Sequence, residues 1–324
     1  MGKPGKGIDK DQLYGIIESR NIEKIQFGLE QQFLTWYGST AYFQLSSRKL
    51  GIRDPDGRGS SRDYTSKSPK IRRAGERDEG HCWLETLYVC EYCFKYTDIR
   101  SELQQHVHKC PRRLKPLGRL QYRSSELSIR RIHGRKHTLF CQCLCLFTKL
   151  FLDNKSMYFK VDHYDFYVAY DTQTNKPMAF FSKDLISFQE NNLACILTFP
   201  PYQRRGLATL LMDFSYKISQ RDGLISGPEQ PLSPFGLVSY LKYWSALICH
   251  QFVEGELSGE SRVSLDDIAS ATGMRTGDIL MTLKSLDCIT PDKELSLNVL
   301  RRWAKKNSLY KKAFIDDDFV LLDG

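Results

Sequence analysis

The sequence predicts a mixed α+β fold. Short apolar runs typical of strands occupy residues 158–169 and 177–181, and residues 193–199 have the continuous apolar character of a buried strand. An amphipathic helix is predicted directly after Gly206, because its apolar residues recur at helical spacing. After Gly255 the pattern changes to short helices separated by turn residues, which indicates a small helical unit at the C-terminal end.

Length, charge and the distribution of apolar residues limit the classes of protein to consider. The 324 residues suffice for two or three small domains, and 47 Lys and Arg against 38 Asp and Glu give a net charge of +9. That balance suits a protein working near nucleic acid or chromatin. No apolar run is long enough to cross a bilayer, and residues 1–10 do not resemble a secretory signal, so we expect a nuclear or cytosolic protein without a membrane partner.

Composition changes sharply from segment to segment along the first eighty residues. Residues 1–12 are basic and rich in glycine, and we expect them to be disordered. Residues 13–43 carry apolar and aromatic side chains in strand-like stretches. Residues 44–80 are rich in Ser, Arg, Gly, Asp and Lys and contain too little apolar surface to offset their ordering entropy, so we predict a mobile insertion.

Residues 81–118 contain the spacing of a structural zinc site, formed by Cys90, Cys93, His106 and Cys110. A Cys-x2-Cys pair fits a tight knuckle, and His106 and Cys110 lie about one helical turn apart, so both pairs can face one ion. His108 is a weaker candidate, because it lies only two residues before Cys110. Four protein ligands leave no open position for catalysis. The alternative is a zinc finger that contacts DNA, although one finger alone would recognise a DNA sequence only weakly.

Three further cysteines belong to a predicted helix over residues 139–152. Cys141, Cys143 and Cys145 lie among Leu and Phe residues, so we interpret them as buried free thiols.

Residues 203–208, with the sequence Gln-Arg-Arg-Gly-Leu-Ala, predict an anion-binding loop between a buried strand and a helix. Small residues at Gly206 and Ala208 let backbone N–H groups approach a pyrophosphate, and the helix that begins there adds the positive end of its dipole. Arg204 and Arg205 add positive charge. The sequence contains neither a dinucleotide fingerprint nor a P-loop lysine motif, which argues against NAD enzymes and P-loop ATPases.

Residues 255–324 have the outline of a helix-turn-helix. Ser264 to Asp267 form a capping box, Gly273 ends the first helix, and residues 276–286 form a second. The second helix contains Asp278 and few basic residues, so we expect a winged-helix-like structural support that does not read DNA sequence.

Several separate stretches resemble the MYST family of histone acetyltransferases, in the order in which that family carries them. They are residues 20–28, 35–37, 90–93, 150–155, 181–183, 194–206, 214–216 and 231–233. The resemblance runs from about residue 14 to the end, apart from residues 44–80, and is strongest to a fungal branch that acts in silencing. Gly227 departs from the family pattern, which usually has serine there, and Phe180 occupies a position often held by tyrosine.

The resemblance implies an acetyl-coenzyme A-binding core of the GNAT type over residues 119–254, with one structural Zn²⁺ in the finger before it. It implies that Glu229 is the general base, which suits the chemistry, because a lysine must lose a proton before it attacks a thioester. Cys195 matches the active-site cysteine, either as an acetyl carrier or as a small residue lining the pocket, and we favour direct attack. Lys155 matches the autoacetylated lysine. The implied contacts with acetyl-coenzyme A are Ile196, Leu197, Thr198, Gln203, Arg204, Arg205, Gly206, Leu207, Ala208 and Ser233. Ser233 is also a candidate N-cap.

The expected substrate is a histone tail in chromatin, with lysine sixteen of histone H4 implied by the silencing branch. The same resemblance implies nuclear location, nucleosomes as partners, and accessory subunits of a silencing acetyltransferase complex. The alternative function is an inactive zinc-finger scaffold that binds chromatin or DNA. Such a scaffold would not need Glu229, Cys195 and the anion-binding loop together.

Overall fold

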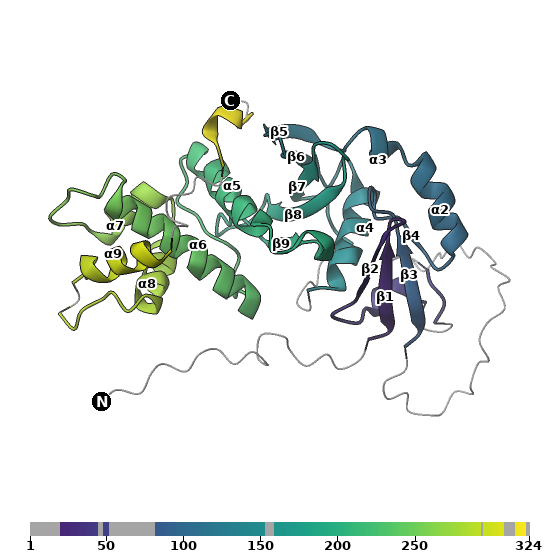
Figure 1. Ribbon diagram of the computed structural model, residues 1–324, viewed down its shortest axis with the longest axis horizontal. Coiled ribbons are helices and arrows are strands. Elements are labelled where there is room, and N and C mark those ends of the chain that lie inside the picture. Colours follow the sequence, from purple (N-terminus) through teal and green to yellow (C-terminus); the bar gives the residue numbers. More distant parts are fainter. Residues whose placement is uncertain are drawn as a thin grey trace. The chain divides into compact units, whose positions relative to one another are not determined.

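The computed structural model describes residues 20–44, 48–51, 82–152, 159–292, 294–307 and 315–321 (Figure 1). The chain divides into two compact units. The N-terminal unit comprises Tyr14–Pro116 and His137–Val161, and the C-terminal unit includes Leu117–Lys136 and Asp162–Gly324. Residues 1–12, most of 44–80 and Lys155 lie outside the described residues, so the predictions made for them stay predictions.

The N-terminal unit contains a four-stranded sheet in the order β2-β1-β3-β4. Its strands are β1 (Ile22–Phe27), β2 (Gln31–Leu34), β3 (Leu84–Val89) and β4 (Tyr96–Thr97). The strands predicted within residues 13–43 are therefore present. β1 pairs antiparallel with β2 and parallel with β3, so the N-terminal strands and the cysteine-bearing module share one sheet. The short η1 (Thr40–Tyr42) follows β2.

Helices α2 (Arg100–Lys109), α3 (Pro111–Leu114) and α4 (Thr138–Lys149) complete this unit. α4 packs by aromatic contacts, with ring centroids of Phe27 and Phe147 5.2 Å apart and those of Phe94 and Phe147 5.4 Å apart. Cys141, Cys143 and Cys145 are all buried in α4, which confirms that they are core residues. Burial raises the pKa of the Cys143 thiol to about 12, so it stays neutral at physiological pH.

The described part of residues 44–80 is ordered against its surroundings. Phe43 forms a β-bridge with Leu50, and the Gln44 N–H donates to the Lys49 carbonyl at 2.9 Å. The Arg48 guanidinium lies 5.0 Å from the centre of the Trp83 ring. These contacts hold residues 48–51 against Phe43, Gln44 and Trp83, which composition alone did not indicate.

The C-terminal unit is built on a five-stranded antiparallel sheet in the order β5-β6-β7-β8-β9. Its strands are β5 (Arg119–Arg123), β6 (Leu127–His133), β7 (Tyr164–Asp171), β8 (Pro177–Asp184) and β9 (Cys195–Thr198). β7 begins at Tyr164, later than the predicted start at residue 158, because residues 162 and 163 form a turn. Helix α5 (Leu207–Arg221), predicted after Gly206, packs Leu211 and Phe214 into the same core as Tyr167 and Phe181.

Helices α6 (Pro234–Val253), α7 (Leu265–Thr272), α8 (Thr276–Ser285) and α9 (Leu297–Lys306) form a second core in this unit (Figure 1). The predicted capping box is present, because Ser264 accepts from the Asp267 N–H and Asp267 accepts from the Ser264 N–H. Gly273 ends α7 in the left-handed region, at φ 70°. The short η2 (Pro200–Tyr202) and η4 (Asp317–Phe319) complete the described elements of this unit. No described helix combines the length and apolarity needed to span a membrane.

Candidate functional site

The four predicted metal ligands come together in the N-terminal unit. The ligand atoms of Cys90, Cys93, His106 and Cys110 all lie within 4.8 Å of one another. β3 leads into the turn that carries Cys90 and Cys93, where the Phe94 N–H donates to the Cys90 carbonyl at 3.0 Å. The last turn of α2 supplies His106, whose Nε2 lies 3.1 Å from the Cys93 sulfur. His108 is exposed and outside the cluster, so the choice of His106 is confirmed.

The chemistry of this cluster fits a zinc ion. Three sulfurs and one imidazole nitrogen are a preferred donor set for tetrahedral Zn²⁺. Hydrogen bonds from Cys90 and Cys93 lower the pKa of the Cys110 thiol, in the direction that favours the metal-binding thiolate. The hydrogen bond with Cys110 raises the pKa of Cys93 to about 11, and a metal must displace the proton held there. Among the described residues, no second group of this kind occurs.

The predicted anion-binding loop connects β9 to α5 in the C-terminal unit. Arg204 and Gly206 both adopt left-handed backbone angles, at φ 63° and φ 80°, which turns the chain sharply into the helix. Gly206 is the N-cap of α5, and no side chain caps that end. A Cβ on Gly206 would meet no atom within 4 Å. The first N–H groups of α5 therefore have no side-chain cap, and the space beside Gly206 is open, which suits an anion such as a pyrophosphate.

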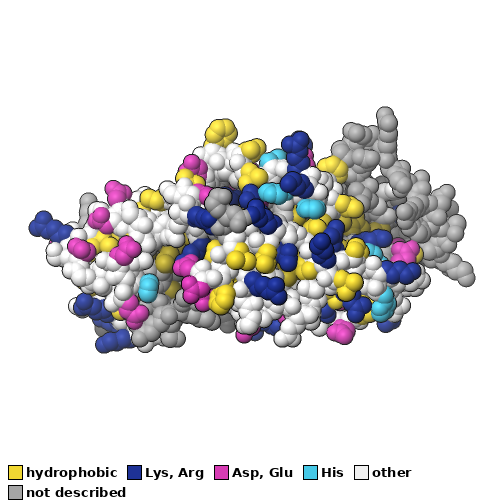
Figure 2. All heavy atoms as spheres, turned by 90° about the horizontal axis from the view of Figure 1, so that it is seen from above, with side chains coloured by type: hydrophobic (Ala, Val, Ile, Leu, Met, Phe, Trp, Pro, Cys, Tyr) yellow, Lys and Arg dark blue, Asp and Glu magenta, His cyan; other side chains and the backbone are white. Residues whose placement is uncertain are grey.

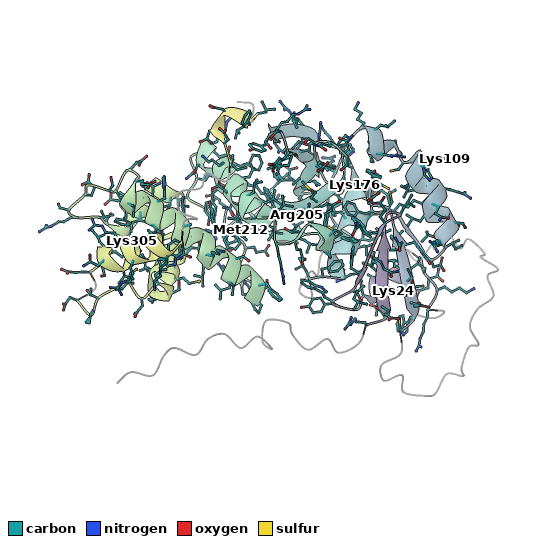
Figure 3. All side chains as sticks on the ribbon, in the orientation of Figure 1. Lys24, Lys109, Lys176, Arg205, Met212 and Lys305 are labelled. Carbon is teal, nitrogen blue, oxygen red and sulfur yellow. The ribbon has the colours of Figure 1, made fainter. Side chains whose placement is uncertain are left out.

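Side chains around the loop hold its shape and add positive charge. Gln203 Nε2 donates to the Thr198 carbonyl at 3.2 Å and so ties the loop to β9. The Arg205 guanidinium lies 5.5 Å from the centre of the Tyr202 ring. Arg204 and Arg205 are both exposed, and Figure 3 labels Arg205. The Thr198 hydroxyl is buried without a hydrogen-bond partner in the described structure, so a bound ligand can satisfy it.

The segment that carries Glu229 is fixed by its backbone. The Glu229 N–H donates to the Leu193 carbonyl at 2.8 Å, and Leu193 forms a parallel bridge with Pro228. The Glu229 side chain is exposed. Cys195 begins β9 two residues after Leu193, so the two predicted catalytic residues lie on neighbouring backbone segments. Cys195 is half-buried, so the prediction that this strand is buried was wrong at this position. β9 is an edge strand, covered less completely than the strands inside the sheet.

A residue that the sequence analysis missed supports this segment. Arg275 donates to the Pro228 carbonyl at 3.5 Å, to the Gln189 carbonyl, and to Asn191 Oδ1 at 2.9 Å. No local motif distinguishes Arg275 from an exposed arginine, because its acceptors lie far away in the chain.

The glycine at position 227, where the family that the sequence resembles usually has serine, also has a structural reason. A Cβ there would lie 2.3 Å from Oδ2 of Asp278, which is buried and has no hydrogen-bond partner among the described residues. Only glycine fits this close approach without movement of the carboxylate.

Ser233 caps helix α6, because its hydroxyl accepts from the Gly236 N–H at 3.1 Å. The predicted N-cap role is therefore confirmed, whereas the predicted contact with acetyl-coenzyme A stays a prediction. The other predicted contact residues lie on β9 or in the loop and first turn of α5. They are Ile196, Leu197, Leu207 and Ala208.

A zinc-fitted cluster in the N-terminal unit, and a helix N-terminus opened by Gly206 with a backbone-fixed Glu229 in the C-terminal unit, are features that suit a protein of the acetyltransferase class. Residues 115–320 match the family model described as MOZ/SAS family, and the chain belongs to this family. The predicted α+β acetyltransferase fold and MYST membership are thereby confirmed.

The chain is 52% identical over 319 residues to the Saccharomyces cerevisiae protein named histone acetyltransferase SAS2, covering 98% of this chain and 90% of that protein. It is 40% identical over 206 residues to Drosophila melanogaster histone acetyltransferase MOF, covering 63% and 24% respectively. A solved aminoglycoside acetyltransferase from a soil metagenome aligns at a TM-score of 0.28 and 16% identity, over 43% of this chain and 92% of that chain. The last similarity is too weak to support an argument.

Proposed function

We propose that this chain is a histone lysine acetyltransferase that uses acetyl-coenzyme A. The observation that carries the proposal is the pairing of an uncapped α5 N-terminus at Gly206 with a backbone-fixed Glu229 beside the start of β9. The 52% identity to the protein named histone acetyltransferase SAS2 supports a histone as the acetyl acceptor.

The loop at residues 203–208 holds the pyrophosphate of acetyl-coenzyme A in this proposal. Backbone N–H groups at the start of α5 point toward the phosphates, and the helix dipole adds favourable potential. Arg204 and Arg205 are exposed beside this end and supply positive charge. Ile196, Leu197 and Thr198 on β9 then line the arm that leads toward Cys195.

Glu229 acts as the general base. A lysine ammonium has a pKa of about 10.4 in water, so it must lose a proton to become a nucleophile. The Glu229 carboxylate takes that proton, the amine nitrogen bonds to the acetyl carbon, and the carbon–sulfur bond breaks. The nitrogen gives up its second proton to the departing sulfur, so the products are the amide and the coenzyme A thiol. Cys195 lines the pocket in this direct route. In the alternative route its sulfur first carries the acetyl group.

Zn²⁺ has a structural role in this proposal. Cys90, Cys93, His106 and Cys110 would hold it, and its binding would fasten the knuckle after β3 to the end of α2. Because all four ligand positions belong to the protein, no step of acetyl transfer passes through the metal.

The preferred acceptor is lysine sixteen of the histone H4 tail in nucleosomes, which places the protein in the nucleus. Accessory subunits of a silencing complex and autoacetylation of Lys155 belong to the same proposal.

Labelled acetyl-coenzyme A, an H4 tail peptide and its lysine-sixteen-to-arginine variant test the substrate directly. Transfer to the first peptide and loss with the second is expected. Failure of the chain to bind acetyl-coenzyme A would instead favour the scaffold alternative.

A further inference from the structure

Helix α9 and the end of α6 line a half-open pocket in the C-terminal unit, and none of its lining residues belongs to the candidate site described above. Its volume is about 590 Å³. The lining residues are Val253, Asn298, Arg301, Arg302, Ala304 and Lys305. Three of these six are cations and none is acidic, so the pocket is built to hold a negatively charged group.

The sequence of α9 explains why its cations gather on one side. Leu300 and Ala304 are buried in the core that α9 shares with α6, and Trp303 packs against the same core. The opposite side of the helix must then face solvent, because residues three or four apart share a face. We call its four exposed cations the α9 basic face. They are Arg301, Arg302, Lys305 and Lys306. Figure 3 labels Lys305 on this helix.

The α9 basic face has no counter-charge in the described structure. None of its four side chains takes part in an ion pair or hydrogen bond there. The acidic residue next to Val253 in the chain is Glu254, whose carboxylate lies 4.0 Å from His250 Nδ1. Like charges at i and i+4, as at Arg301 and Lys305, repel each other, and an anion bound between them relieves that repulsion.

We propose that the α9 basic face is a binding site for the phosphate backbone of duplex DNA, independent of base sequence. Two rows of cations run along α9, Arg301 with Lys305 and Arg302 with Lys306. Within each row the two Cβ atoms are about 5–6 Å apart, as for any pair four residues apart on a helix. DNA presents a repeating line of phosphates along each strand, and arginine binds phosphate oxygens through two parallel N–H groups. An acidic peptide fits less well, because the lining offers only Val253 and Ala304 as apolar anchors.

We expected that α8 does not recognise DNA sequence. Binding through α9 is consistent with that expectation, since phosphate contacts carry no base information. Lys and Arg side chains are spread over the molecular face in Figure 2, in line with the net charge of +9. General positive charge alone therefore predicts weak DNA binding, and the experiment must separate a defined site from that background.

The test compares two variants of the full chain with the same change in net charge. One carries Arg301→Gln, Arg302→Gln and Lys305→Gln. The control carries Lys242→Gln, Arg262→Gln and Lys284→Gln, three exposed cations of the same unit that lie outside the pocket. Fluorescence anisotropy with two labelled duplexes of unrelated sequence measures affinity over a series of salt concentrations.

The pocket variant should bind both duplexes at least ten-fold more weakly. The slope of log affinity against log salt concentration should fall by about 0.9 for each phosphate that the variant no longer neutralises. The control should keep the wild-type affinity and slope. Equal weakening in both variants, or wild-type affinity in the pocket variant, would overturn the proposal. Displacement of wild-type protein by polyglutamate but not by unlabelled duplex would assign the pocket to an acidic protein surface instead.

Acetylation assays add an independent reading. The pocket variant should lose activity on nucleosomes while keeping wild-type activity on an isolated histone tail peptide, because only nucleosomes contain DNA. DNA binding needs no acetyl transfer, so a chain inactive in acetylation but normal in DNA binding would contradict the proposed function alone. Unchanged thermal unfolding of both variants confirms that the exposed substitutions leave the fold intact.

Discussion

Arg275, at the start of α8, donates a hydrogen bond of 2.9 Å to Oδ1 of Asn191, which lies between β8 and β9. The same guanidinium reaches the carbonyl of Pro228, the residue before Glu229. One side chain therefore joins the approach to β9 to the segment that carries the proposed base. The planar guanidinium suits this bridging role, because its donors have fixed directions. We infer that Arg275 is a positioning residue for Glu229.

Replacing Arg275 with alanine tests this positioning role. We expect kcat to fall by about ten- to a hundred-fold, because small displacements of a catalytic group are costly. Affinity for acetyl-coenzyme A should stay the same, since the hydrogen bonds of Arg275 go to Pro228, Gln189 and Asn191 and not to the loop at Gly206. Steady-state kinetics and calorimetry measure the two quantities. Arg262→Ala, at an exposed arginine of the same unit, should change neither. A parallel loss of cosubstrate affinity in Arg275→Ala would indicate general damage to the unit.

The zinc module gives a second prediction with a matched control on one helix. His106→Ala should release the metal and lower the free energy of unfolding of the N-terminal unit by several kcal/mol, because metal binding contributes directly to folding. Cys90→Ser should do the same. His108→Ala, two residues from His106 on α2, should retain one zinc per chain. Elemental analysis and thermal unfolding provide the measurements, and a folded wild-type protein without zinc contradicts the assignment.

Local signals in the sequence were sufficient for several parts of the structure. The spacing of Cys90, Cys93, His106 and Cys110 identifies a cluster that the fold brings together. The capping box at Ser264 and the left-handed glycine at 273 mark the ends of α7 correctly. These features depend on residues only a few positions apart, or on a ligand set whose spacing is constrained by one ion.

Contacts between distant residues could not be predicted in the same way. The parallel pairing of β1 with β3 joins strands on either side of residues 44–80, and no local pattern encodes it. Arg275 reaches acceptors 47 and 86 positions away in the chain. Hydrophobic periodicity identifies which elements form and which side they bury, but many pairings satisfy the same pattern.

Gly206 gives a third prediction. Gly206→Asp places a carboxylate at the mouth of the anion-binding loop and should weaken coenzyme A binding at least ten-fold, about 1.4 kcal/mol. Gly206→Asn is the matched control, because asparagine has nearly the same shape, carries no charge and tolerates the left-handed conformation at φ 80°. Calorimetry should show a much smaller decrease in affinity for asparagine. Equal decreases in the two variants would mean that steric blocking or backbone strain, and not charge, decides binding.

Asp278 predicts a pH dependence of stability. Burial raises the pKa of its carboxyl from 3.8 to about 6, although the charge of Arg275 lowers it. Between these two values the folded chain holds a proton that the unfolded chain has lost, so stability falls as pH rises through this window. Asp278→Asn removes this titration. The free energy of unfolding of Asp278→Asn minus that of wild type should therefore increase as pH rises. The increase from about pH 4 to about pH 7 should be on the order of 2–3 kcal/mol.

Urea unfolding at both pH values measures this difference. Asp292→Asn, at an exposed turn residue, is the control and should show a constant offset from wild type. A constant offset for Asp278→Asn as well would show that the buried carboxyl does not titrate differently in the folded state.

Glu229→Gln gives the decisive test of mechanism. The amide keeps the shape of the side chain but cannot accept the proton, so turnover should fall by about a hundred- to ten-thousand-fold. Binding of acetyl-coenzyme A should remain close to wild type, because the loop at Gly206 is untouched. The acidic limb of the pH–rate profile should flatten, since that limb reports protonation of the base.

Cys195→Ala separates the two possible routes of acetyl transfer. If the lysine attacks the thioester directly, the variant loses only a pocket-lining thiol and should keep most of its turnover. If the Cys195 sulfur must carry the acetyl group, turnover should be abolished and single-turnover mass spectrometry of wild-type protein should detect acetylated Cys195. We expect the first outcome, because direct attack needs only one base to deprotonate the lysine, and we assign that role to Glu229. A dead Cys195→Ala together with a fully active Glu229→Gln would replace Glu229 with another base and require a cysteine-centred mechanism.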